Sequence, residues 1–309
     1  MGSVFLYLSL RDVPLSEAWR VLRGADVGWV LLALGGVALN NAAKVWRWQV
    51  LLAERRRHVP FGLGLQAVLA GQMVNYLLPM RAGDLSRAYL VGVRQTGTVY
   101  ALGTIALEKV LDTLMYALLF LLTALALPLP AWANNSGLTL GFFSAAMGLG
   151  AWLLARHSGE MLAFFLRIAK ILPPRWAHNL ETRLQDALHT LGVVRNGRAL
   201  TALALWSLVV WGSAVFPNWA LLRALSLPGG WSAAAAVLVF LQAVVSLPGV
   251  PGRVGVFQYA CILALALFGV AETAAFSYGV LLQAVAVLPV ILGGVVSFGG
   301  LRWRPLPQE

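Results

Sequence analysis

The sequence predicts an all-α polytopic membrane protein, and three observations support that prediction. Of its 309 residues, 60% are hydrophobic and only 11% are charged, and the mean hydropathy is +0.78. Several apolar runs approach or exceed the roughly 20 residues that a helix needs to cross a bilayer. The runs are continuous, whereas the strands of a membrane barrel would alternate apolar and polar residues. Helices are expected because they satisfy their backbone hydrogen bonds internally in lipid.

The net charge of +11 is explained by membrane topology. The basic residues concentrate between the apolar runs, as they do in cytoplasmic loops, so we expect no nucleic-acid partner. The histidines lack metal-ligand spacing, and no nucleophile elbow, phosphate-binding loop or dinucleotide fingerprint is present. We therefore expect no metal, no cofactor, no catalytic residue and no enzymatic activity.

The apolar runs define the elements in order. Residues 1–26 contain only the run VFLYLSL, which is too short to cross a bilayer and suggests a truncated first span. The full spans that we expect are 27–48, 98–127, 137–155, 199–226 and 274–298. At the end of the first span we expect Lys44 and Arg47 to extend toward water and Trp46 and Trp48 to lie at the interface.

The charge of the loops orients these spans. Arg55, Arg56 and Arg57 indicate a cytoplasmic end, the loop 127–136 is uncharged and should lie outside, and the basic, amphipathic loop 156–198 should lie in the cytoplasm. The tail, 299–309, carries Arg302 and Arg304, so we expect a cytoplasmic C-terminus in the plasma (inner) membrane. Full crossings by 61–79 or 232–269 would reverse this pattern. Both segments are therefore expected to be re-entrant helical hairpins, which enter and leave on one side.

A short motif occurs once in each re-entrant segment. Pro79, Arg81 and Gly83 form Pro-x-Arg-x-Gly, and Pro251, Arg253 and Gly255 repeat it 172 residues later. The same offset relates the starts of span, hairpin and span in the two halves. We therefore expect an inverted-repeat helical bundle, with repeats at 27–127 and 199–298 and hairpins of opposite orientation. The alternative is chance recurrence of a turn sequence.

The polar residues near these motifs are the candidate site. Asp84 can cap the helix that follows the first bend, and a helix N-terminus flanked by Arg81 and Arg87 suits an anion. Arg253 offers the same chemistry from the other hairpin, and Asn75 and Gln258 add neutral groups suited to a sugar or phosphate. Internal pairing of these arginines is the alternative.

Glu108 and Asp112 lie four residues apart on one face of the span 98–127. A carboxylate within the membrane is costly, so three roles are open: an ion pair with Arg81, Arg87 or Arg253, a proton or counter-ion site for transport, or exposure at the cytoplasmic end. The bends themselves depend on Pro79, Gly83, Pro251, Gly252 and Gly255 as structural hinges.

These segments resemble a known family. GQMVNYLLPMRAGDLSRAYL is similar to the N-x-x-x-P-x-R-x-G-[D/E]-x-x-R signature of the flippase-like lysylphosphatidylglycerol synthetase transmembrane family, LEKVLD to its E-[RK]-x-x-D span and PGVPGRVGVFQ to its second, Pro-Gly-rich motif. The resemblance covers about residues 27–298. Its matched positions are Asn75, Pro79, Arg81, Gly83, Asp84, Arg87, Glu108, Asp112, Pro251, Gly252 and Gly255. Members often have Glu where this chain has Gln258, and we expect no soluble aminoacyl-transfer domain after Arg304.

The resemblance implies a transporter or flippase for an anionic lipid, either an aminoacylated phospholipid or a polyprenyl-phosphate-linked sugar. A non-transporting membrane subunit that anchors a lipid-modifying or glycosyltransferase partner is the alternative. An intramembrane transferase is a third hypothesis, which the lack of catalytic motifs disfavours.

Overall fold

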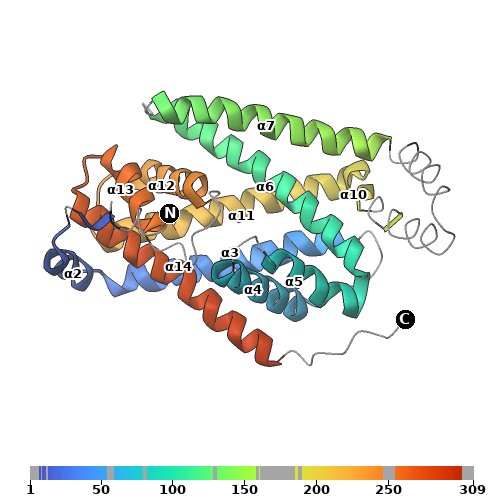
Figure 1. Cartoon of the computed structure of the whole chain (residues 1–309), viewed down its shortest axis with the longest axis horizontal. Coiled ribbons are helices and arrows are strands. Elements are labelled where there is room, and N and C mark those ends of the chain that lie inside the picture. The colour runs from blue at the N-terminus through green and yellow to red at the C-terminus, as the bar shows by residue number, and fades with distance from the viewer. Residues whose placement is uncertain are drawn as a thin grey trace.

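The structure is a computed structural model that describes residues 7, 9–11, 13–53, 59–78, 82–127, 131–157, 160, 185–186, 190–245 and 255–300. Within these residues the regular elements are all helical, which confirms the all-α prediction. The first half contains α2 (Leu15–Arg23), α3 (Val27–Leu52), α4 (Phe61–Leu77), α5 (Ala82–Val91), the π-helical turn η2 (Gly92–Thr96), α6 (Thr98–Ala126) and α7 (Ala131–Arg156). The second half contains α10 (Gly192–Arg195), α11 (Gly197–Ala224), α12 (Gly230–Val245), α13 (Val256–Ala266) and α14 (Glu272–Gly300) (Figure 1).

Four described helices are long and apolar enough to cross a membrane: Val27–Leu52, Thr98–Ala126, Gly197–Ala224 and Glu272–Gly299. They correspond to four of the five predicted spans, so the chain is a multi-pass membrane protein. The remaining predicted span, 137–155, falls within α7, where Thr139–Leu154 is a shorter apolar stretch.

Side-chain caps fix the start of the two central helices. The Asp26 carboxylate accepts hydrogen bonds from the backbone N–H groups of Gly28 and Trp29 at the start of α3. Asn196 does the same for Arg198 and Ala199 at the start of α11. Such caps satisfy backbone donors that have no partner within the helix. The two helices then pack along one another through the centre of the molecule.

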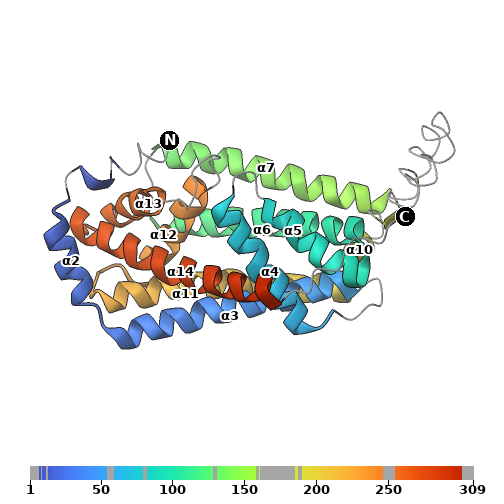
Figure 2. The same cartoon turned by 60° about the horizontal axis from the view of Figure 1, so that its bottom comes forward.

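The two halves contain helices in the same order and of similar length. In the first half α3, α4, α5 and α6 have 26, 17, 10 and 29 residues. In the second half α11, α12, α13 and α14 have 28, 16, 11 and 29 residues. The colour gradient shows that α3 and α11 run in opposite directions, as do α6 and α14 (Figures 1 and 2).

The packing partners correspond as well. Helix α4 packs against α14 of the other half, and α12 packs against α6. The pair α4 and α5 shares a hydrophobic core with Trp48, Leu51 and Leu52 at the end of α3. The pair α12 and α13 shares a different core with Ala33 near the start of α3. The two short-helix pairs therefore lie toward opposite ends of the central α3–α11 pair (Figure 2).

Aromatic residues mark both ends of that central pair. Trp219 stacks on Trp231 and contacts Trp29 edge-on at one end. Trp46 contacts Phe61 and Trp206 at the other end. Trp29 and Trp46 are separated along α3 by about 25 Å of helix rise, close to the thickness of the hydrocarbon core that such aromatic belts border.

Candidate functional site

A buried ion pair joins α5 to α6. Arg87 donates from Nη1 to Oε1 of Glu108 at 3.1 Å and from Nη2 to Oε2 at 2.5 Å. The side chains are only 7% and 5% exposed, and the Arg87 guanidinium lies over the Trp48 ring, 3.8 Å from its centroid. A bidentate pair of this kind fixes geometry as well as charge. Glu108 therefore takes the first of the three roles that the sequence left open, an ion pair with Arg87.

A second arginine, from α3, completes the cluster. Arg47 donates from Nη1 to Oδ1 of Asp112 at 2.7 Å, and its Nη2 lies 3.4 Å from Oε1 of Glu108. The Arg47 side chain is 1% exposed, so the expectation that it extends toward water was wrong. Trp48 is also buried, with its Nε1 donating to Thr104 Oγ1 at 3.0 Å. Both side chains turn inward because their partners lie on α6.

The remaining charges surround this core. Lys109 Nζ lies 3.3 Å from Asp84 Oδ2, and Asn75 Nδ2 reaches Asp84 Oδ1 at 3.4 Å. Trp211 donates from Nε1 to Asp112 Oδ1 at 3.3 Å. Helices α3, α4, α5, α6 and α11 thus contribute to one polar network.

The network forms the wall of a cavity of about 490 Å³, here called the charged cavity. Its charged lining residues come from α3, α5 and α6: Lys44, Asp84, Arg87, Glu108, Lys109 and Asp112. Asn75, Gln72, Tyr76 and Gln242 add neutral polar groups. The cavity is therefore suited to a charged and hydrogen-bonding group inside an otherwise apolar bundle.

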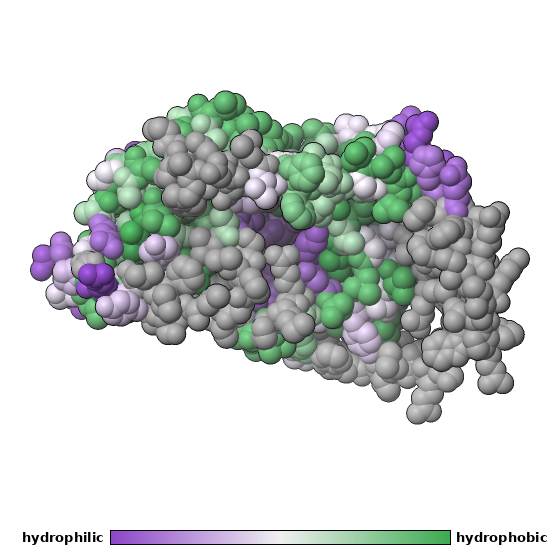
Figure 3. All heavy atoms as spheres, turned by 45° about the horizontal axis from the view of Figure 1, so that its top comes forward, coloured by the Kyte–Doolittle hydropathy of each residue, from purple (hydrophilic) through white to green (hydrophobic). Residues whose placement is uncertain are grey.

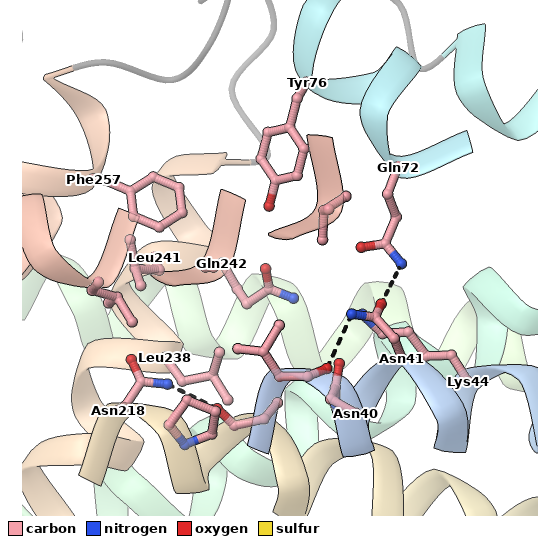
Figure 4. Close-up of a pocket in the computed structure, with 16 residues that line it drawn as sticks. Asn40, Asn41, Lys44, Gln72, Tyr76, Asn218, Leu238, Leu241, Gln242 and Phe257 are labelled. Atoms are coloured by element: carbon pink, nitrogen blue, oxygen red, sulfur yellow. Dashed lines mark hydrogen bonds between the residues drawn. The ribbon is translucent and has the colours of Figure 1, made fainter. Parts of the chain in front are cut away.

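A smaller cavity of about 170 Å³, the amide cavity, adjoins the first. Both are lined by Lys44, Gln72, Tyr76 and Gln242, so they are two parts of one polar space. Figure 4 shows Tyr76 and Gln242 projecting into it from opposite sides, and Gln72 donates to Asn41 Oδ1 at 2.8 Å. The far wall includes Phe257 of α13, so both short-helix pairs reach this polar space.

The glycines of the two motifs are held in similar ways. The Gly83 N–H donates to Asn75 Oδ1 at 2.9 Å, and the Gly255 N–H donates to Gln258 Oε1 at 2.8 Å. Gly255 has φ +82°, a conformation that favours glycine. In both bends an amide side chain therefore binds the backbone of the motif glycine.

The pair α4 and α5 is joined by backbone-to-backbone contact. A Cβ on Gly83 would lie 1.8 Å from the carbonyl oxygen of Gly71, and a Cβ on Gly71 would lie 2.8 Å from that of Gly83. Only residues without side chains allow this approach.

The structure brings several of the predicted site residues together and separates others. Asn75, Asp84, Arg87, Glu108 and Asp112 all line the charged cavity. Gln258 is 5% exposed and uses both ends of its amide inside the protein, because its Nε2 donates to Gln283 Oε1 at 2.8 Å. Five further predicted residues lie outside the described part of the chain: Pro79, Arg81, Pro251, Gly252 and Arg253.

Sequence reasoning missed three basic residues of the site. Lys44 and Arg47 were interpreted as the polar end of a span, and Lys109 was given no role of its own. The sequence spacing could have indicated two of them, because Lys44 and Arg47 are three residues apart and therefore share one face of the helix. Lys109 falls between Glu108 and Asp112, and no pattern in the sequence identifies Asp84 as its partner.

These features define a helical membrane protein with a charged cavity enclosed by spanning and shorter helices. Residues 1–294 match the sequence model of a protein family, the lysylphosphatidylglycerol synthase TM region. The chain belongs to that family, as its motifs predicted. Comparison with curated proteins and with solved structures gave no match.

Proposed function

We propose that the chain is a transporter that moves an anionic lipid across the membrane. The observation that carries this proposal is the polar space shared by the two cavities, which both short-helix pairs reach inside an apolar bundle. Membership of a lysylphosphatidylglycerol synthase transmembrane family supports a lipid cargo. An aminoacylated phospholipid and a polyprenyl-phosphate-linked sugar both have the required chemistry, an anionic phosphate next to a polar headgroup.

An inverted repeat with two re-entrant hairpins is part of the proposal. The matched helix lengths support it, as do the reciprocal contacts of α4 with α14 and of α12 with α6. At about 25 Å and 15 Å of helix rise, α4 and α5 suit a hairpin that enters and returns. Such an arrangement places interrupted helices from both halves at a central site.

The headgroup-binding role is assigned to the arginines of the two Pro-x-Arg-x-Gly motifs. Arg81 and Arg253 are the proposed phosphate ligands, with Asn75 and Asp84 nearby in the first half. Arg87 is paired with Glu108 on both nitrogens, so its proposed contribution is to position α5. Gln258 likewise acts through the bend at Gly255.

The orientation proposed from the loop charges has the C-terminus in the cytoplasm of a plasma (inner) membrane. In this orientation the end of α3, which is followed by Arg55, Arg56 and Arg57, faces the cytoplasm. The charged cavity then lies toward the cytoplasmic side, because Lys44, which lines it, is two residues from Trp46 near that end.

Translocation in reconstituted vesicles is the direct test. Purified chain is incorporated into vesicles that carry a trace of headgroup-labelled phosphatidylglycerol, and the label accessible to an impermeant quencher is followed with time. We expect faster loss of the inner-leaflet label than in protein-free vesicles, and slower loss with Arg81→Ala or Arg253→Ala. Lys at either position should restore only part of the rate, because it lacks the bidentate fork.

The test is repeated with aminoacylated and glycosylated phospholipids and with folded protein in either orientation. A translocation rate equal to that of protein-free vesicles in every case would contradict transport. The alternative function, a membrane anchor for a lipid-modifying or glycosyltransferase partner, would then be favoured.

A further inference from the structure

Lys44 differs from the other basic residues around the charged cavity. Arg47 and Arg87 are held by Glu108 and Asp112, and Lys109 lies against Asp84. In the described part of the chain the Lys44 ammonium has no hydrogen bond and no ion pair within 4 Å. Its side chain nevertheless lines both cavities (Figure 4). Among the four basic residues of this described network, Lys44 is therefore the one whose ammonium is not already within ion-pair distance of a carboxylate.

The charges of the described network do not balance. Three carboxylates face four basic side chains: Asp84, Glu108 and Asp112 against Lys44, Arg47, Arg87 and Lys109. Each carboxylate is already within ion-pair distance of a cation other than Lys44. A charge in a poorly hydrated place is costly unless it is paired, so a ligand with one negative charge would complete the set.

The surroundings of the cavity indicate where that ligand comes from. Figure 3 shows a hydrophilic hollow in the long side of the molecule, between apolar surfaces, and not at an end of the long helices. If the long helices span the bilayer, we expect a group that enters there to come from the bilayer. The anionic group that bilayer lipids share is the phosphodiester, which carries one negative charge and several acceptor oxygens. Gln72, which donates to Asn41, and Gln242 line both cavities together with Lys44.

We propose that Lys44 is a further phosphate-binding residue, inside the polar space and in addition to the arginines of the two bends, and that the ligand is a singly charged phosphodiester lipid. The lipid's phosphate lies against the Lys44 ammonium, where the two cavities join, and its polar headgroup extends among the amides of the amide cavity. This inference deepens the proposed function, since it names the cavity residue that recognises the cargo. It is also independent of Arg81 and Arg253.

Lipid binding to the purified full-length chain tests the assignment without requiring transport. Delipidated protein in a neutral detergent is titrated with phosphatidylglycerol or phosphatidylcholine, and bound lipid is counted by native mass spectrometry. The variants are Lys44→Met, which keeps the length of the side chain, and Lys44→Arg, which keeps the charge. Arg223→Met is the matched control, because Arg223 is an exposed cation on α11 that stacks on Trp29 and lines neither cavity.

We expect phosphatidylglycerol to bind more tightly than phosphatidylcholine, because only the former has a net charge that balances Lys44. Lys44→Met should weaken phosphatidylglycerol binding about tenfold or more, the loss expected for a charge-assisted hydrogen bond. Lys44→Arg should retain most of the affinity, and Arg223→Met should match the unaltered chain. Soluble glycerophosphoglycerol should compete only weakly, since it lacks the acyl chains that contact the apolar surface of the protein.

Two results would overturn the assignment. Phosphatidylglycerol binding that is equal in Lys44→Met and the unaltered chain would remove Lys44 from the site. Competition by glycerophosphoglycerol at the same concentration as the lipid would show a site for a soluble phosphate ester. Failure of the transport proposal looks different: Lys44-dependent binding without translocation in vesicles would leave the binding site intact and contradict transport alone.

Discussion

Arg87 meets Glu108 with two parallel N–H···O hydrogen bonds, one from each Nη nitrogen to its own carboxylate oxygen. The two residues come from α5 and α6 and lie in a space that is almost closed to solvent. Each charge therefore depends on the other, and on Arg47 beside them. Removing Glu108 leaves Arg87 buried without its partner, removing Arg87 leaves Glu108 with only its 3.4 Å contact to Arg47, and removing both leaves Arg47 with Asp112.

We expect Arg87→Met to destabilise the protein strongly, by about 3 to 5 kcal/mol, the usual cost of breaking a buried pair. The double variant Arg87→Met/Glu108→Gln should be more stable than Arg87→Met alone, because it also removes the buried carboxylate that has lost its bidentate partner and keeps only the longer contact to Arg47. This double-mutant cycle is measured by thermal unfolding, in detergent, of the parent protein, Arg87→Met, Glu108→Gln and the double variant. Additive losses in the double variant would mean that the two charges are not coupled.

Asp112→Asn should be milder than Glu108→Gln. The Asp112 side chain is 31% exposed to the cavity, whereas that of Glu108 is 5% exposed. Asparagine keeps an oxygen that can accept from Trp211, and Arg47 keeps its contact with Glu108. We expect a loss of about 1 kcal/mol, read from the unfolding temperature of each variant beside the parent protein. A larger loss than in Glu108→Gln would contradict this ranking.

Gly83→Ala should prevent α4 and α5 from packing. The added methyl group would meet the Gly71 carbonyl oxygen at 1.8 Å, and this atom belongs to a helix backbone that cannot rotate away. We expect a loss of about 3 kcal/mol or more, seen as little folded protein after extraction. Gly212→Ala in α11 is the matched control, because a Cβ there meets nothing within 4 Å. Equal yields of the two variants would refute the close contact.

Cysteine labelling tests the re-entrant hairpins. In a Cys261→Ser background, single cysteines replace four exposed residues that flank the short-helix pairs: Ala53, Arg94, Ser226 and Ala271. If each pair enters and leaves on one side, positions 53 and 94 should react with an impermeant maleimide from the cytoplasm. Positions 226 and 271 should react from outside. Labelling of 53 and 94 from opposite sides would mean that the first pair crosses the membrane.

Hydropathy was sufficient to predict where the long helices lie. Asp26 directly precedes one apolar run, and Thr98 begins another. The predicted starts at 27 and 98 are those of α3 and α6. The residues that flank the first Pro-x-Arg-x-Gly motif, Asn75, Asp84 and Arg87, line the charged cavity. Such features are local, so a single sequence contains them.

The ion-pair partners depend on tertiary packing and could not be predicted individually. Arg47 and Asp112 are 65 positions apart in the sequence, and only the packing of α3 beside α6 brings them together. A basic residue near the end of an apolar run normally extends toward water, and Arg47 has that sequence context. Its inward direction depends on a carboxylate that a different helix supplies.

The contact between Gly71 and Gly83 also constrains how the polar space can open. Two helices whose backbones touch over this contact have no side chains there to rearrange, so α4 and α5 have to move as one rigid body. The contact with α14 differs, because Gly293 and Gly294 lie mainly against the side chains of Leu69 and Met73, although a Cβ on Gly294 would also lie 3.1 Å from the Leu69 carbonyl oxygen. If the polar space opens for a lipid, we therefore expect α4 and α5 to move together and α4 to slide against α14.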